Sequence, residues 1–191
     1  MKDLRAKPLR ARREMHPDAR RRASAIICQR VIGSHEFLSS HFIGCFLPMN
    51  HEVDTREIIE RAWRAKKRIF VPVLRAKHKM SFREIHPEST LEQNCFGVWE
   101  PVDGDSIRPR NLDMVVTPTV AYDKENNRIG MGSGYFDRCF SFLRHRQQWF
   151  RPKLVGVAFE CQKVEKITPN AWDIRLYRVI SDAPPPPDSA A

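Results

Sequence analysis

The sequence lacks any apolar run long enough to cross a membrane. A membrane-spanning helix needs about 20 mainly apolar residues, and no run approaching that length occurs in the 191-residue chain. The N-terminus reads Met-Lys-Asp-Leu-Arg and has no apolar segment of the kind that secretory signal peptides carry. Both absences predict a cytoplasmic protein that has no membrane partner.

Cysteine is sparse and unevenly spaced. An odd number of cysteines, none of them in a Cys-x-x-Cys pair, argues against a disulfide framework and against a structural zinc site. We expect reduced, mostly buried thiols. The chain has five cysteines, which are Cys28, Cys45, Cys95, Cys139 and Cys161.

Acidic residues are the scarcer charge. The chain has 23 Asp and Glu against 33 Lys and Arg, a formal net charge of +10. Residues 1–22 hold nine Lys and Arg and three Asp and Glu, so 9 − 3 = +6 lies in this arm. Three interpretations stay open: a solvated basic helix, a surface for polyphosphate or another acidic ligand, or a nucleic-acid contact. The arm has no aromatic residue to stack on bases, so nucleic acid is the weakest.

The first part of the chain alternates predicted helices and strands. His16-Pro17-Asp18 is typical of a helix start, and an apolar stripe follows it to a stop at Gly33. Residues 42–47 and 69–73 are short apolar runs typical of buried strands. Between them, residues 54–57 read Asp-Thr-Arg-Glu, the spacing of a capping box, and predict a helix. This order predicts a β-α-β unit with two parallel strands.

The remaining chain continues the alternation. Residues 80–82 alternate as in a half-exposed strand, residues 114–116 predict a buried strand that ends in a bend, and residues 154–159 predict another. Residues 135–147 are expected to be helical. We therefore predict an α/β fold, a three-layer sandwich with a mainly parallel central sheet flanked by helices. Residues 1–183 would form one domain and the proline-rich residues 184–191 a disordered tail.

Glycine is also scarce, yet it clusters at one place. Of the eight glycines, Gly130, Gly132 and Gly134 fall within five residues, just before the helix predicted from Tyr135. Glycine lets backbone N–H groups turn inward, and a helix start adds further donors. With Arg128 at its edge, the segment predicts a cradle for phosphate.

The glycine spacing excludes two familiar nucleotide motifs. It is not Gly-x-x-x-x-Gly-Lys-Ser/Thr, so the chain has no P-loop here. It is Gly-x-Gly-x-Gly rather than Gly-x-Gly-x-x-Gly, so a dinucleotide fingerprint is not supported. A tight turn between a strand and a helix remains the structural alternative. Asp137, in the first turn of the predicted helix, could bind magnesium on bound phosphates or simply complement the helix dipole.

Five segments along the chain, this motif among them, carry a further signal. Residues 128–138 read Arg-Ile-Gly-Met-Gly-Ser-Gly-Tyr-Phe-Asp-Arg, and residues 117–123 read Thr-Pro-Thr-Val-Ala-Tyr-Asp. Residues 52–55 read Glu-Val-Asp-Thr, residues 164–173 end in Trp-Asp, and Leu4-Arg5 lie near the N-terminus. Together they resemble the 5-formyltetrahydrofolate cyclo-ligase family, also called 5,10-methenyltetrahydrofolate synthetase. The resemblance covers residues 2–182.

The resemblance implies an enzyme with ATP and magnesium as co-substrate and metal. It implies ring closure of 5-formyltetrahydrofolate to 5,10-methenyltetrahydrofolate, with release of ADP and phosphate. The formamide oxygen is a poor leaving group, so transfer of the γ-phosphoryl group to it would activate it, and such transfer is catalysed mainly by positioning and charge. We expect small-molecule partners and a monomer.

The resemblance also implies roles for individual residues, carried over position by position. Arg128 is the expected catalytic residue, and Asp137 and Asp173 the magnesium ligands. The expected ATP contacts are Lys2, Arg5, Arg128, Ile129, Gly130, Met131, Gly132, Ser133, Gly134, Tyr135 and Phe136. The expected folate contacts are Glu52, Phe96, Met131, Gly132, Ser133, Gly134 and Tyr135.

Two departures from the family pattern bear on function, one in the loop and one upstream of it. Ser133 stands where some members carry lysine, and Thr119 replaces a usual glycine. A relative that binds nucleotide or folate without turnover is therefore one alternative. The basic arm leaves a basic RNA-binding module as another.

Overall fold

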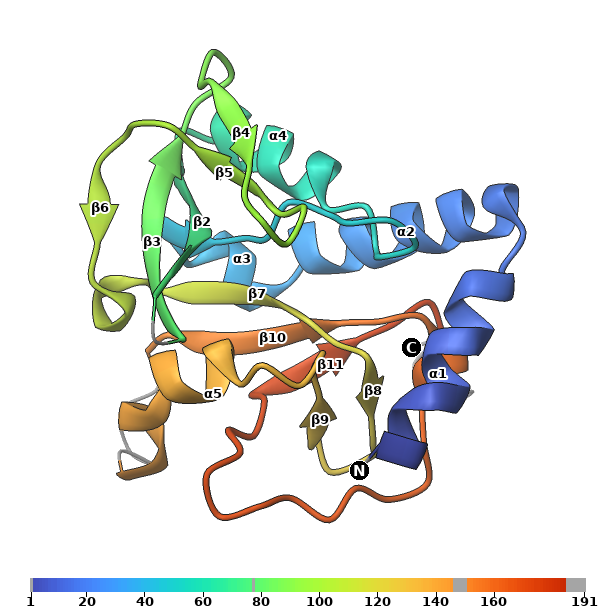
Figure 1. Ribbon diagram of the computed structural model, residues 1–191. Coiled ribbons are helices and arrows are strands. Elements are labelled where there is room, and N and C mark those ends of the chain that lie inside the picture. Colours follow the sequence, from blue (N-terminus) through green and yellow to red (C-terminus); the bar gives the residue numbers. More distant parts are fainter. Residues whose placement is uncertain (1, 77, 146–150, 185–191) are drawn as a thin grey trace.

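Seven strands form the central sheet, in the spatial order β11-β10-β7-β1-β2-β3-β6 (Figure 1). The computed structural model describes residues 2–76, 78–145 and 151–184. The strands of this sheet are β1 (Phe42–Gly44), β2 (Arg68–Arg75), β3 (Lys79–Ile85), β6 (Ser106–Ile107), β7 (Met114–Pro118), β10 (Lys153–Val157) and β11 (Arg178–Ile180).

Most of this sheet is parallel, as predicted. β1 pairs in parallel with β2 and β7, and β10 pairs in parallel with β7 and β11. β3 and β6 complete one edge in the antiparallel sense. The chain between β2 and β3 spans only residues 76–78, too short for a parallel crossover, so these two strands form a hairpin.

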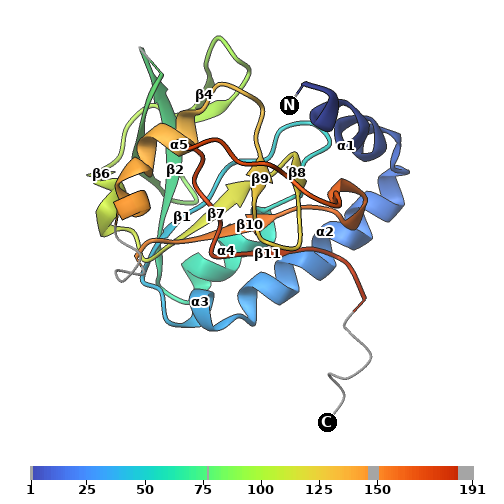
Figure 2. The same cartoon turned by 90° about the horizontal axis from the view of Figure 1, so that it is seen from below.

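Helices cover both faces of the sheet, which confirms the three-layer prediction. α2 (Pro17–Ile32), α3 (His35–Leu38) and α4 (Arg56–Arg64) lie on one side, and α5 (Tyr135–Cys139) lies on the other (Figure 2). Residues of β7 alternate between the two layers. Met114 and Val116 pack in the core under α2 and α4, whereas Val115 packs in the core under α5.

Two helix starts show how local signals succeed and fail. α2 begins and ends where predicted, with His16 as N-cap accepting a bond from the Asp18 N–H at 3.3 Å. The predicted capping box at residues 54–57 is wrong. α4 begins at Arg56 with no side-chain bond from its N-cap Thr55, because the Thr55 hydroxyl donates to the Phe46 carbonyl at 2.7 Å. The Glu57 carboxylate accepts a bond from Gln29 on α2.

The predicted helix over residues 135–147 is shorter than expected. α5 ends at Cys139 and a 3-10 turn, η2 (Ser141–His145), follows; residues 146–150 lie outside the described ranges. The break occurs at Phe140, which has φ −103° and a completely buried ring packed near Phe82 at 5.9 Å between centroids. The helix thus ends at the residue whose ring packs in the core.

The other predicted strands are present, and β2, β3 and β7 are longer than predicted. β1 ends at Gly44 rather than at residue 47, and β10 ends at Val157 rather than at residue 159. Within the described ranges, no helix is long and apolar enough to cross a membrane. Cys28 and Cys45 are buried, but Cys95 and Cys161 are exposed, so burial of the thiols is only partial.

The remaining elements surround the sheet. α1 packs against η3 and β8. The predicted tail of residues 184–191 lies, apart from its first residue, outside the described residues. The elements are α1 (Lys2–Glu14), η1 (Pro109–Asn111), η3 (Glu160–Gln162), the hairpin of β4 (Leu91–Gln93) with β5 (Trp99–Pro101), and the hairpin of β8 (Ala121–Tyr122) with β9 (Arg128–Ile129).

Candidate active site

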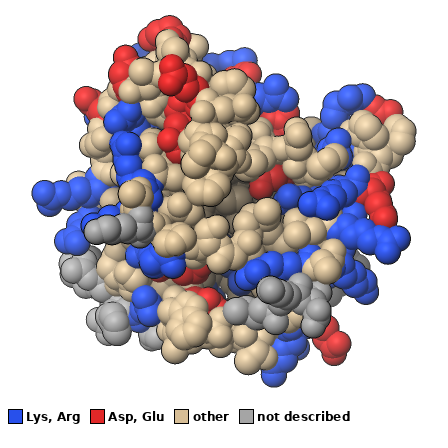
Figure 3. All heavy atoms as spheres, viewed as in Figure 1, with Lys and Arg blue, Asp and Glu red and all other residues tan. Residues whose placement is uncertain are grey.

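A cavity of about 670 Å³ opens beyond the carboxyl ends of β1, β2 and β7. Phe46 follows β1, Leu74 lies near the end of β2, and Thr119 follows β7, and all three line the cavity. In the space-filling view the surface is hollowed near its centre, with basic side chains on both sides (Figure 3). This edge is where open parallel sheets place their ligands, and the volume suits a ligand of cofactor size.

The glycine loop forms one wall of this cavity. It joins β9 to α5, and Gly132 and Gly134 have φ values of +109° and +64°. Among the described residues, no hydrogen bond uses the backbone N–H groups of residues 131–136. Because α5 has only five residues, the loop rather than a helix dipole supplies the donors. The sequence interpretation of an anion cradle fits this geometry.

Three arginines press against the three glycines of the loop. Each guanidinium occupies space that a side chain on the glycine would need, so only glycine lets the cations approach the loop backbone this closely. A Cβ atom added to the glycine would lie 2.9–3.0 Å from a guanidinium nitrogen in the pairs Gly130 with Arg128, Gly132 with Arg5, and Gly134 with Arg138.

Arg128 is the most enclosed of these cations. Its side chain is 4% exposed, and its Nη2 lies 3.0 Å from Oδ1 of Asp137. The same carboxylate oxygen accepts the Ile174 N–H at 3.1 Å. Burial lowers the pKa of Arg128, while Asp137 and Asp173 oppose that shift, and an arginine remains cationic at any ordinary pH. Its Nε has no partner among the described residues, which leaves a buried donor for a ligand.

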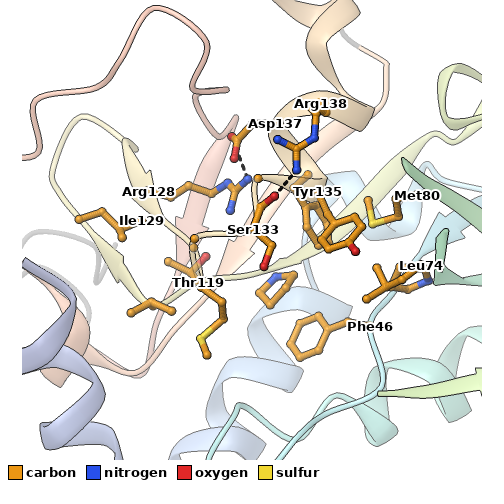
Figure 4. Close-up of a pocket in the computed structure, with 18 of the residues that line it drawn as sticks. Phe46, Leu74, Met80, Thr119, Arg128, Ile129, Ser133, Tyr135, Asp137 and Arg138 are labelled. Carbon is orange, nitrogen blue, oxygen red and sulfur yellow. Dashed lines mark hydrogen bonds and ion pairs between the residues drawn. The ribbon is translucent and has the colours of Figure 1, made fainter. Parts of the chain in front are cut away.

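Arg138 holds the loop from the other side. It donates to the carbonyl oxygen of Ser133, drawn as a dashed line in Figure 4, and to that of His78 at 3.3 Å. Its guanidinium also lies 6.0 Å from the centre of the Tyr135 ring. Arg138 therefore places a positive charge beside Ser133, the loop position at which this chain has no lysine.

Asp137 and Asp173, the predicted metal ligands, both line the cavity. Asp173 accepts the Asn170 N–H at 2.8 Å, and Asp137 is held by Arg128. Within the described ranges, no cluster of three or more His, Cys, Asp or Glu side chains could hold a metal alone. Two carboxylates beside a phosphate cradle fit magnesium, which commonly takes one or two carboxylates and completes its shell with phosphate oxygens and water.

The opposite wall is apolar. Leu74 and Met80 lie across the cavity from Arg128, with Phe46 on the same side and Tyr135 between them (Figure 4). Such a wall can bury a flat heteroaromatic ring, while the arginine side receives negative charge. The cavity thus has one polar and one apolar end.

Glu52 supplies a carboxylate to the cavity from a side chain that is only 12% exposed. Its Oε2 accepts the Met49 N–H at 3.1 Å, and its Oε1 lies 3.7 Å from Nη1 of Arg12. Burial raises the pKa of Glu52 above its ordinary value, and the Met49 and Arg12 contacts oppose that shift. A carboxylate in this setting can accept hydrogen bonds from ligand amino or ring N–H groups.

The fold brings nearly all the predicted site residues to one cavity. Arg5, Glu52, Phe96, residues 128–137 and Asp173 line it, although they come from distant parts of the chain. The side chain of Lys2 lies outside the described residues, so its ATP contact stays a prediction. Sequence reasoning missed several lining residues. Arg138 and Trp172 carried a signal, since both lie in segments that resemble the family, but the others had none: Met49, Leu74, Met80 and Arg144.

Comparisons with known proteins agree with this geometry. Residues 1–182 match the family model described as the 5-formyltetrahydrofolate cyclo-ligase family. The chain is 33% identical over 174 residues to 5-formyltetrahydrofolate cyclo-ligase of Escherichia coli K12, covering 89% of this chain and 93% of that protein. It is 27% identical over 192 residues to the Mus musculus protein of the same name, with 95% and 93% coverage.

Solved structures show the same fold. The 5,10-methenyltetrahydrofolate synthetase of Aquifex aeolicus, solved by NMR, superposes with a TM-score of 0.80 at 28% identity, covering 95% of this chain and 89% of that one. The Mycoplasma pneumoniae synthetase has a TM-score of 0.75 at 22% identity, with 95% and 98% coverage, and supports the fold alone. By its family match and by its similarity to these relatives, the chain belongs to the 5-formyltetrahydrofolate cyclo-ligase family of enzymes.

Proposed function

We propose that this protein closes the ring of 5-formyltetrahydrofolate to give 5,10-methenyltetrahydrofolate, with consumption of ATP and release of ADP and phosphate. One observation carries the proposal. A single cavity joins a glycine loop flanked by Arg5, Arg128 and Arg138 to an apolar wall. The triphosphate of ATP needs the cationic loop and the pterin ring needs the apolar wall, and the two ligands must lie next to each other to react.

The formyl oxygen is a poor leaving group, so the reaction begins with its activation. The formyl oxygen attacks the γ-phosphorus of ATP, and the bond from that phosphorus to the β,γ-bridging oxygen breaks, which releases ADP. The N-10 nitrogen then attacks the activated formyl carbon and loses its proton. Departure of phosphate with the former formyl oxygen completes the methenyl bridge.

The residues of the loop would hold the transferred group. The N–H groups of residues 131–136 and the guanidinium of Arg128 would bind the phosphate oxygens and stabilise the charge of the transition state. Arg5 would contact ATP from α1. In the described part of the chain, the loop N–H groups and the Nε atom of Arg128 have no hydrogen-bond partner, so they can bind a ligand.

Magnesium would bind at Asp137 and Asp173 and would neutralise charge on the phosphates. Asp137 would bind the metal through Oδ2 and keep its contact with Arg128, since only its Oδ1 is engaged within the described residues. At the other end, Glu52 would accept bonds from the pterin and Phe96 would pack on the folate. We also propose that the protein is a monomer and acts in the cytoplasm.

The decisive experiment follows the absorbance of the methenyl product. Purified protein is mixed with 5-formyltetrahydrofolate, ATP and magnesium, and ADP is measured in the same sample. The proposal expects product and ADP in equal amounts, and neither when ATP or magnesium is omitted. A folded protein that gives no product would overturn it.

The same samples separate the two alternatives. A binding protein without turnover would gain thermal stability from folate or ATP but would release no ADP. An RNA-binding module would bind RNA with an affinity that falls steeply with salt. Removal of residues 1–15 tests the arm, because loss of turnover would favour a role in ATP binding.

A further inference from the structure

Phe96 lies at the tip of the β4–β5 hairpin, at the mouth of the cavity. Its ring is 60% exposed although it lines the cavity. The hairpin forms its own two-stranded sheet, and its turn points toward the loop after β9 (Figure 1). A two-stranded hairpin is only marginally stable by itself. The aromatic ring therefore depends on other contacts for a defined position.

Asn94 organises the turn that carries this ring. Its side-chain Oδ1 accepts the N–H groups of Phe96 at 2.9 Å and Val98 at 3.1 Å. Its backbone N–H donates to the Val98 carbonyl at 3.0 Å, and its own carbonyl accepts the Gly97 N–H at 2.9 Å. Side-chain capping of this kind is typical of asparagine in turns. One residue thus sets the backbone on both sides of Phe96.

Glu100 connects Asn94 to the central sheet. Its Oε1 accepts Nδ2 of Asn94 at 2.7 Å and the N–H of Leu74 at 2.7 Å. Leu74 lies in the part of β2 that extends past its pairing with β1, which ends at Phe70. The carboxylate therefore satisfies a strand N–H that β1 does not reach. A continuous path of hydrogen bonds joins β2 to the turn of Phe96.

We propose that Asn94 and Glu100 are positioning residues that hold the Phe96 ring in place for the folate substrate. The inference rests on the proposed function, in which Phe96 contacts the folate. Neither side chain touches the phosphate cradle, because Asn94 and Glu100 do not line the cavity. Their effect should therefore fall on folate and not on ATP.

The test separates these two substrates. Asn94→Ala should raise the KM for 5-formyltetrahydrofolate about tenfold, the size expected for a lost turn cap. The KM for ATP and kcat should stay within about twofold of the parent. Glu100→Ala should act in the same direction, and Glu100→Gln should restore the parent value because an amide oxygen still accepts both bonds. Glu92→Ala is the matched control, an exposed residue paired with Glu100 across the hairpin.

A double variant shows whether the effect of Asn94→Ala on the folate KM depends on the Phe96 ring. In Phe96→Ala protein, adding Asn94→Ala should change the folate KM by less than about twofold. Equal effects in both backgrounds, or an equal rise in the KM for ATP, would overturn the inference. If Asn94→Ala does not fold, Glu100→Ala decides the same comparison. Absence of turnover in the parent protein would instead overturn the proposed function, and folate Kd values would then carry the comparison.

Discussion

The guanidinium of Arg5 lies against Gly132, so close that a Cβ atom there would be 2.9 Å from Nη1 of the arginine. Arg5 comes from α1, and Gly132 from the loop between β9 and α5. Through this contact, the basic helix α1 forms part of the cavity wall. At least one charge of the basic arm thus has a position in the candidate site.

This contact predicts a clear result for Gly132→Ala. A side chain at φ +109° is strained, and its Cβ would displace the Arg5 guanidinium. We expect a loss of about 1–3 kcal/mol in the free energy of unfolding and a rise of about tenfold in the KM for ATP, measured by denaturation and by steady-state kinetics. Gly33→Ala is the control, because its φ is −78° and its nearest neighbour would be 3.4 Å away. An unchanged KM for ATP would show that the loop does not contribute to ATP binding.

Arg128→Lys tests whether charge alone suffices in the cradle. Lysine keeps the positive charge but loses the planar fork that binds Asp137 and phosphate together. We expect kcat/KM to fall about 100-fold, with little change in the thermal midpoint. Arg10→Lys, at an exposed ion pair of α1, should match the parent protein. Activity within about twofold of the parent would contradict a catalytic role for Arg128.

Asp137→Asn tests the magnesium assignment. The amide keeps an oxygen for the Ile174 N–H but loses the charge that would attract the metal. We expect kcat to fall on the order of 100-fold and the half-saturating magnesium concentration to rise, both measured by titration of the turnover assay. Asp103→Asn, an exposed residue of the same type, serves as control. Parent-like activity at limiting magnesium would reject this role.

Asp123 predicts a dependence of stability on pH. Burial alone would raise its pKa, but bonds from the Asn127 side chain and from three backbone N–H groups outweigh burial and lower the pKa below 3.8. Since the pKa is lower in the folded state, the stabilisation is present above pH 3.8 and is lost as pH falls through the folded value.

Asp123→Asn should therefore lose about 2 kcal/mol of unfolding free energy at neutral pH. It should also lose part of the decline of stability below pH 4 that the parent protein shows. Urea unfolding at several pH values measures both effects. Glu125→Gln in the same turn is the control, because only its backbone N–H bonds to Asp123. If Asp123→Asn shows the parent's dependence of stability on pH, Asp123 is not the group whose protonation destabilises the protein below pH 4.

The local sequence determined the glycine cradle, the β-α-β order and the parallel strands of the fold. Glycine spacing and apolar periodicity act over a few residues, so they are visible without any tertiary contact. The start of α2 was predictable for the same reason, since His16, Pro17 and Asp18 act within one turn.

The tertiary structure alone decided what surrounds the cradle. The capping box at residues 54–57 does not form, because the Thr55 hydroxyl bonds to Phe46 and Glu57 bonds to Gln29 on α2. The helix after Tyr135 ends at Phe140, whose ring is buried in the core. The family resemblance placed Arg5 and Glu52 at the site, but no local spacing or periodicity in their segments shows that folding brings them to this cavity. Contacts between distant segments depend on packing and burial, which a local pattern does not encode.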